Sequence, residues 1–112
     1  MKIALTVWNS RISPVFDAAK TILVAEIKNA EVTNKIYEFF DAQAPASLVK
    51  RLTELQVDLF VTGAITQEPA SVIESSDITL IPFIGGRIDE ALSLFANGES
   101  PAPKMALPGA MK

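Results

Sequence analysis

Residues 8–17 are the part of the sequence richest in groups that could bind a ligand. They read Trp-Asn-Ser-Arg-Ile-Ser-Pro-Val-Phe-Asp and offer two hydroxyls, one amide, one guanidinium and one carboxylate. Hydroxyl, amide and guanidinium groups donate hydrogen bonds to anions, and a loop that presents them from rigid strands is a typical place for a binding site. The alternative interpretation is a packed connecting loop with Trp8 and Phe16 buried in the core.

Two later segments could meet this loop. Gly63-Ala64 and Gly85-Gly86-Arg87 each follow an apolar stretch and precede a helical pattern. Helix N-termini favour anions, and glycine lets the backbone approach a ligand closely, although glycines can also serve only as turns and caps. We predict a small-anion site whose binding residues are Asn9, Ser10, Arg11, Ser13, Phe16, Gly63, Ala64, Gly85, Gly86 and Arg87.

The composition disfavours several kinds of chemistry. The chain has no cysteine and no histidine, so thiolate or imidazole metal sites and histidine-based catalytic triads cannot be built from it. The stretch from Lys2 to Val7 contains no Asp or Glu, whereas nuclease-like chemistry needs carboxylates that converge on Mg²⁺. We therefore expect no metal site and no enzyme, but a binding protein or a protein-interaction module.

Size and charge narrow the class further. The 112 residues are 49% hydrophobic, with a mean hydropathy of +0.30 and a net charge of −3, which is typical of a single globular domain and not of a nucleic-acid binder. No apolar run approaches the length of a membrane span. We expect a cytoplasmic protein without membrane or nucleic-acid partners, either a monomer or a homodimer, with a small anionic ligand or a metal cluster as its partner.

The hydrophobic pattern predicts the elements that position the site. An α/β fold follows, with a five-stranded mixed sheet of order 3-2-1-4-5 in which only strand 2 is antiparallel, and with helices on both faces. Residues 1–98 are expected to form the domain, and residues 99–112 a flexible, proline-rich tail. The predicted strands are 2–7, 20–28, 31–40, 59–61 and 78–82, and the predicted helices start at Pro45 and span 67–75 and 87–96.

This sheet order places the three ligand-binding segments together. Strands 1 and 4 are parallel neighbours whose connections leave toward opposite sides, and open α/β sheets bind ligands beyond the carboxyl ends of the strands at such a point. The segments after strands 1, 4 and 5 would therefore line one crevice.

Four short motifs, in this order, resemble those of the dinitrogenase iron-molybdenum cofactor biosynthesis family. After an opening strand come residues 10–14 (Ser-Arg-Ile-Ser-Pro) and Phe16-Asp17, then residues 55–65 and finally Ile84-Gly85-Gly86. The resemblance covers residues 2–96. It implies a ribonuclease H-like three-layer α/β/α sandwich and a non-catalytic protein that binds or carries an iron-molybdenum cofactor or its precursor.

The chain departs from the family pattern in its metal ligands. Many members carry His where this chain has Val15, and several carry further His or Cys in their loops. The implied cofactor would then have to dock as an anion on N–H groups and arginines, and divergence to another anionic ligand, or to a regulatory module with none, stays open.

Overall fold

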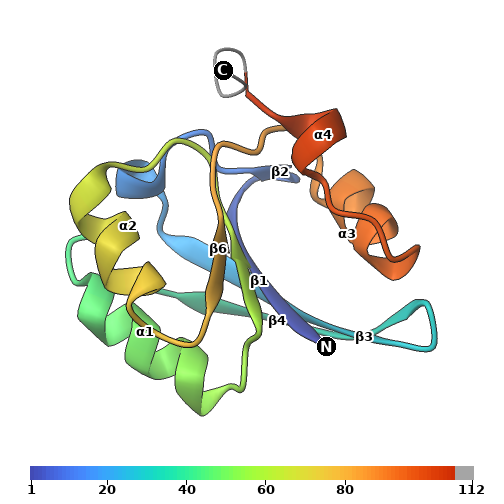
Figure 1. Ribbon diagram of the computed structural model, residues 1–112, viewed down its shortest axis with the longest axis horizontal. Coiled ribbons are helices and arrows are strands. Elements are labelled where there is room, and N and C mark those ends of the chain that lie inside the picture. The colour runs from blue at the N-terminus through green and yellow to red at the C-terminus, as the bar shows by residue number, and fades with distance from the viewer. Residues whose placement is uncertain (108–112) are drawn as a thin grey trace.

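The computed structural model describes residues 1–107 of the chain. They form one mixed β-sheet with helices on both of its faces (Figure 1). The strands are β1 (Lys2–Trp8), β2 (Arg11–Ile12), β3 (Thr21–Lys28), β4 (Glu31–Phe39), β5 (Leu59–Val61) and β6 (Thr79–Ile81). The helices are the short 3-10 helix η1 (Phe16–Ala18), α1 (Pro45–Glu54), α2 (Gln67–Glu74), α3 (Ile88–Ala96) and α4 (Ala102–Met105).

The sheet has the order β4-β3-β1-β5-β6, and β2 pairs with the end of β1. β1 runs parallel to β5, and β5 to β6, whereas β3 is antiparallel to both β1 and β4. With β2 set aside, this path matches the predicted one. The predicted number of five strands is corrected to six, because Asn9 adopts a left-handed φ of 57° and turns the chain back after two residues. Trp8 is thereby paired with Arg11.

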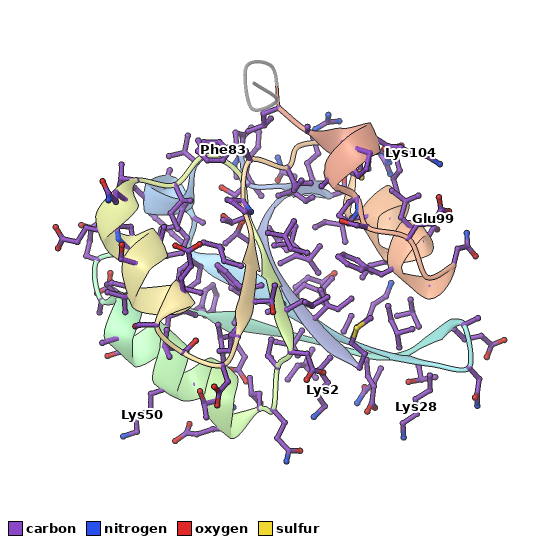
Figure 2. The ribbon with its side chains drawn as sticks, in the orientation of Figure 1. Lys2, Lys28, Lys50, Phe83, Glu99 and Lys104 are labelled. Atoms are coloured by element: carbon purple, nitrogen blue, oxygen red, sulfur yellow. The ribbon has the colours of Figure 1, made fainter. Side chains whose placement is uncertain are left out.

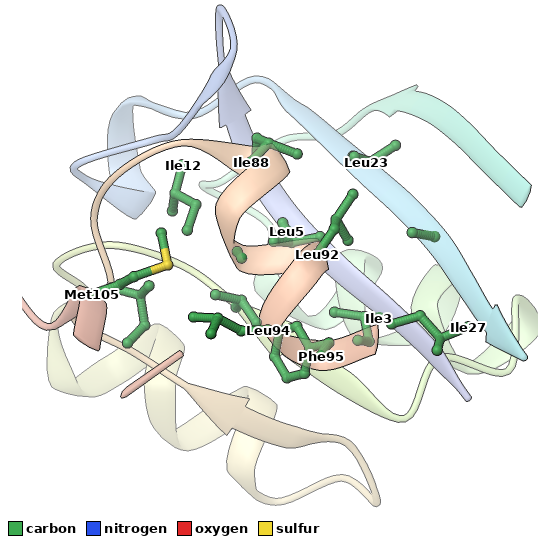
Figure 3. Packing of buried hydrophobic residues seen from close by; sticks show 14 residues of the cluster. Ile3, Leu5, Ile12, Leu23, Ile27, Ile88, Leu92, Leu94, Phe95 and Met105 are labelled. Carbon is green, nitrogen blue, oxygen red and sulfur yellow. The ribbon is translucent and has the colours of Figure 1, made fainter. Parts of the chain in front are cut away.

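Each face of the sheet has its own hydrophobic core. On one face, Leu5 and Leu23 pack against Leu92 of α3 (Figure 3). On the other face, α1 and α2 cover a cluster that includes Phe16 and Phe60. β1 is covered on both faces, so residues 3–6 are all buried, which is why the central strand is almost continuously apolar.

The helices begin and end close to the predicted residues. α1 starts at Pro45 and buries Leu48 and Leu52, because proline at the first helical position gives up an N–H that would have no partner. α2 and α3 agree with the predicted ranges 67–75 and 87–96 to within one residue at each end.

The β3–β4 hairpin turns at Asn29 and Ala30, as predicted. Both residues have positive φ values, 53° and 63°, which is the conformation of the tight turn whose twist suits a hairpin. β4 is the outermost strand and most of its side chains are exposed, which confirms the prediction of an edge strand here.

The segment after α3 packs against the domain. Pro101 and Met105 are buried, the Gly85 N–H donates to the Met105 carbonyl at 2.8 Å, and the Leu107 N–H donates to the Phe83 carbonyl at 2.8 Å. The prediction of a flexible tail from residue 99 is therefore wrong for residues 101–107. A segment this short has no periodicity to reveal its buried side chains; the rest of the predicted tail, residues 108–112, lies outside the described residues.

α4 lies beside α3 (Figure 1), and on its outer surface Lys104 Nζ is 3.4 Å from Glu99 Oε1 (Figure 2). None of the helices within residues 1–107 has the length and hydrophobicity needed to cross a bilayer.

Candidate functional site

The three segments predicted to converge do meet at the carboxyl ends of β1, β5 and β6. Val15 forms a parallel bridge with Ala64, the Phe16 N–H donates to the Ala64 carbonyl at 2.8 Å, and the Ala64 N–H donates to the Pro14 carbonyl at 2.8 Å. The Phe83 N–H, after β6, donates to the Gly63 carbonyl at 3.0 Å. The connections therefore form one hydrogen-bonded cluster of loops.

Several backbone groups of the crevice that was predicted to hold an anion are used in bonds between the loops. The N–H groups of Ala64, Gly85 and Ile88 donate to the carbonyls of Pro14, Met105 and Ser10, respectively. Gly63 is needed for packing, because a Cβ there would collide with the backbone oxygens of Ser13 and Pro14. These three N–H groups hold the loops to each other and to the C-terminal segment, so the predicted cradle of free N–H groups is corrected at Ala64, Gly85 and Ile88.

Besides Gly63, two of the predicted binding residues are buried in the structure. Phe16 is fully buried, with its ring centroid 5.7 Å from that of Phe40 and 6.1 Å from that of Phe60, so it anchors the loop in the core and its ring cannot reach a ligand. Ser13 is 3% exposed, and its Oγ donates to the Val15 carbonyl at 3.1 Å. Both are structural residues of the loop.

A buried pair of hydroxyls below the loops was missed by the sequence analysis. Thr6 Oγ1 and Thr62 Oγ1 are 2.8 Å apart and both residues are fully buried. The Thr6 carbonyl also accepts the Ser13 N–H at 2.9 Å. Because unpaired buried hydroxyls are costly, this pair fixes how the ends of β1 and β5 lie against each other. In the sequence, this pair could have been predicted from a threonine near the end of each of the two apolar strands.

The exposed side chains of the loop cluster form a row. Trp8 is directly opposite Arg11 in the β1–β2 hairpin, and Arg11 is directly opposite Arg87 in an antiparallel bridge. Residues opposed in this way point to the same face of a sheet. We call Trp8, Arg11 and Arg87 the Trp–Arg–Arg row; all three are exposed.

The backbones of the two arginines of the row are held close together. The bridge is flanked by bonds from the Ile12 N–H to the Gly86 carbonyl (2.9 Å) and from the Ile88 N–H to the Ser10 carbonyl (3.0 Å). This is the pattern of a non-hydrogen-bonded pair, in which the two Cα atoms are about 4.5 Å apart and the side chains lie close together. Like charges placed there repel each other unless an anion neutralises them.

Their charges are only partly neutralised by the protein. Arg87 Nη2 is 3.6 Å from Asp89 Oδ2, with both side chains more than half exposed, so the pair is weak. Within residues 1–107, Arg11 has no carboxylate at ion-pairing distance. The row thus presents one arginine with a weak partner and one without.

Two hollows include Trp8 in their lining. One, of about 220 Å³, is lined by Trp8, Ser13, Pro14, Val15 and Ala18. The other, of about 360 Å³, is lined by Val7, Trp8, Asn9, Ala18, Ala19, Lys20 and Thr21. Trp8 is 60% exposed, so the interpretation that places it in the core is wrong. Val7 packs against the cluster that α3 covers. Because side chains alternate along a strand, the Trp8 side chain lies on the opposite face of β1.

The predicted site residues fall into two groups, those at the surface near Trp8 and those that hold the loops together. Arg11 and Arg87 lie in the Trp–Arg–Arg row, Asn9 and Ser13 line hollows beside Trp8, and Ser10 is exposed in the turn. Trp8 and Lys20 were not in the predicted set. The predicted residues that serve to pack or bond the loops are Phe16, Gly63, Ala64, Gly85 and Gly86.

A further hollow has the wrong charge for an anion. Its volume is about 200 Å³ and its lining includes the carboxylates of Asp17 and Glu68. Across residues 1–107, no three acidic side chains gather closely enough to hold a metal ion.

Comparison with known proteins supports a family assignment. The family model described as dinitrogenase iron-molybdenum cofactor matches residues 1–98. The chain is 27% identical over 106 residues to the uncharacterized protein MJ0580 of Methanocaldococcus jannaschii, covering 88% of each chain.

Solved structures show the same fold. The crystal structure of MJ0327, a proposed dinitrogenase of M. jannaschii, has a TM-score of 0.70 at 27% identity and covers 88% of this chain and 90% of that one. TM1290, a proposed NifB protein of Thermotoga, has a TM-score of 0.67 at 17% identity and covers 96% and 98%. With its match to the family model across nearly the whole domain, the chain belongs to the dinitrogenase iron-molybdenum cofactor family.

Proposed function

We propose that this protein is a non-catalytic binding protein that holds a small anionic ligand on the Trp–Arg–Arg row. The observation that carries the proposal is the close pairing of Arg11 with Arg87. An anion placed between two guanidinium groups would accept charge-assisted hydrogen bonds from both and would relieve their repulsion. Trp8 would form one wall of the site, and the exposed Lys20 would add positive charge beside it.

The family name points to an iron-molybdenum cofactor or its precursor as cargo, and the side chains limit how such cargo could be held. Iron and molybdenum clusters are usually ligated by thiolate or imidazole, and the chain has neither. Met105, the last residue of α4, is buried, with its Cε packed toward Gly86. Cargo of this type would therefore be held by its anionic periphery and not through protein–metal bonds. Another compact oxyanion would fit the same groups.

The absence of catalysis is part of the proposal. We infer that the fold is ribonuclease H-like, since the mixed sheet with a central β1 and helices on both faces has that arrangement. The catalytic chemistry of such folds needs carboxylates beginning on the first strand. β1 has none, and the N–H groups of Ala64, Gly85 and Ile88 are used in bonds between the loops.

The test is calorimetric titration of the purified protein with molybdate, tungstate and phosphate as separate probes. Arg11→Ala should weaken binding about ten- to a hundred-fold, because a charge-assisted hydrogen bond contributes roughly 1.5–3 kcal/mol. Lys50→Ala, on the exposed face of α1, removes the same unit of charge away from the row and should bind as the wild type does.

Equal affinity in Arg11→Ala and the wild type would contradict the proposed site. Failure of all three probes to bind the wild type would contradict the proposal of a small-oxyanion ligand.

A further inference from the structure

Within residues 1–107, no strand pairs with the outer edge of β4, whose backbone groups are free there. β4 is nine residues long and outermost, whereas the opposite edge, β6, has three residues. The Phe40 N–H donates inward to the Lys20 carbonyl at 3.0 Å. Backbone groups alternate in direction along an antiparallel strand, so residues 35, 37 and 39 direct their N–H and C=O groups outward. Such an edge is a template for another strand.

Large apolar side chains line this edge. Phe39 is 89% exposed, Tyr37 63% and Ile36 39%. Tyr37 pairs with Leu23 and Phe39 with Thr21, so both rings lie on the sheet face that α3 covers further in. Exposed aromatic residues on a long edge strand are unusual in a monomer, because they invite association.

We propose that β4 pairs with β4 of a second copy of this chain, antiparallel, about a two-fold axis through Ile36. Ile36 then faces Ile36, Lys35 faces Tyr37, and Asn34 faces Glu38. The outward backbone groups of residues 35 and 37 meet each other, so the two sheets continue into one.

Charge and hydrogen bonding select a second copy in this register. No like charges are opposed: Lys35 lies against an aromatic ring, and the Asn34 amide can donate to Glu38. Glu38 is already neutralised within its own chain, because Arg51 Nε and Nη2 donate to its two oxygens at 2.8 and 2.7 Å.

Other registers fit less well. A shift of the axis to Lys35 would oppose two lysines, and a shift to Tyr37 would place Glu38 against Ile36. A slip of one residue would set outward backbone groups against inward ones.

The first test is sedimentation of the full chain over a range of concentrations. The wild type should show a reversible monomer–dimer equilibrium. Tyr37→Lys, an exposed substitution, opposes lysine to Lys35 twice per dimer and should raise the dimer dissociation constant at least about tenfold. The double variant Lys35→Glu/Tyr37→Lys replaces each repulsion by an opposite-charge pair and should recover the dimer.

The register has its own test, because the chain contains no cysteine. In the proposed dimer, residue 36 faces its copy in a non-hydrogen-bonded pair, whose Cα separation of about 4.5 Å is within the range of a disulfide. Ile36→Cys should form a disulfide-linked dimer on mild oxidation, and Lys50→Cys, an exposed residue of α1, should not.

Three results would overturn the proposal. They are a wild type that stays monomeric at millimolar concentration, a dimer that Tyr37→Lys leaves unchanged, and equal cross-linking of the two cysteine variants. The first would leave the edge free for an extended peptide of another protein, and none of them would bear on the anion site.

Discussion

The loop cluster and the β4 edge both expose aromatic side chains, but they treat their backbones in opposite ways. At the carboxyl ends of β1, β5 and β6, several loop N–H groups, such as those of Ala64 and Gly85, donate to carbonyls of neighbouring segments, and Trp8 and Arg11 are exposed there as side chains. At β4, the outward backbone groups have no partner strand in the described part of the chain, and they lie beside Tyr37 and Phe39. A closed backbone suits recognition by charged side chains, whereas an open one suits strand pairing.

The largest effect is expected where the loops are tightest. Gly63→Ala places a methyl group against the Ser13 and Pro14 carbonyls, and backbone atoms cannot move aside as a flexible side chain can. We therefore expect a loss of roughly 5 kcal/mol or more in the free energy of unfolding, measured in urea, which exceeds the ~1–3 kcal/mol that is typical of overpacking.

Gly98→Ala is the matched control. Gly98 has a φ of +79°, and within residues 1–107 no atom lies within 4 Å of an added Cβ. The alanine should therefore lower the free energy of unfolding by roughly 1–2 kcal/mol, which is the cost of the left-handed conformation for a residue with a Cβ. Equal losses in the two variants would show that the loops are not closed as described.

The two aromatic residues of the loop should differ sharply. Phe16→Ala empties a fully buried position and should lower the free energy of unfolding by about 3–5 kcal/mol. Trp8→Ala removes a side chain that is 60% exposed and should change it by about 0.5–1 kcal/mol. Thermal and urea unfolding of both variants will check this. Similar losses of stability in the two variants would contradict the exposed position of Trp8.

The buried hydroxyl pair should behave as a unit. Thr6→Val leaves the Thr62 hydroxyl buried without the partner that it has at 2.8 Å, at a cost of about 1–3 kcal/mol in the free energy of unfolding. The double variant Thr6→Val/Thr62→Val replaces both partners by groups of the same shape and should recover much of that loss. Additive losses in a double-mutant cycle would argue against a coupled pair.

The smallest effect concerns the ion pair beside the β4 edge. The hydrogen bond from Arg51 lowers the pKa of Glu38 below its usual range. Because the folded pKa is below the unfolded one, the contribution to stability is complete above the unfolded pKa, near 4.3, and is lost as pH falls through the folded pKa. Glu38→Gln should thus destabilise the protein slightly above about pH 5, and the difference should shrink on acidification.

Acid titrations of the free energy of unfolding will test this, with Glu74→Gln, an exposed acidic residue at the end of α2, as the control. A difference between Glu38→Gln and the wild type that does not depend on pH would contradict the ion-pair account.

The sequence predicts the elements that depend on long patterns and misses those that depend on single residues. Apolar runs and the Asn29-Ala30 turn give the mixed sheet and its edge, and proline marks the start of α1. The β1–β2 hairpin depends on the left-handed conformation of Asn9 alone. The packing of residues 101–107 depends on the burial of Pro101 and Met105, and no periodic pattern in the sequence predicts that burial.

The sequence predicts where the candidate site lies but not which of its groups are exposed. Convergence at the carboxyl ends of the strands follows from sheet order, so Arg11 and Arg87 could be predicted together. Whether an N–H group is free depends on which carbonyl lies opposite it, and this is set by the register and by the C-terminal segment. Trp8 and Phe16 are equally apolar by type, and only the strand geometry separates the exposed ring from the buried one.

The most direct test of the Trp–Arg–Arg row uses the fluorescence of Trp8, the single tryptophan of the chain. Titration of the wild type with molybdate should change its emission saturably. Arg11→Ala and Arg87→Ala should each shift the midpoint at least about tenfold to higher concentration, as expected for a lost charge-assisted contact, while Lys50→Ala titrates as the wild type does. A saturable change with the same midpoint in all four proteins would contradict the account.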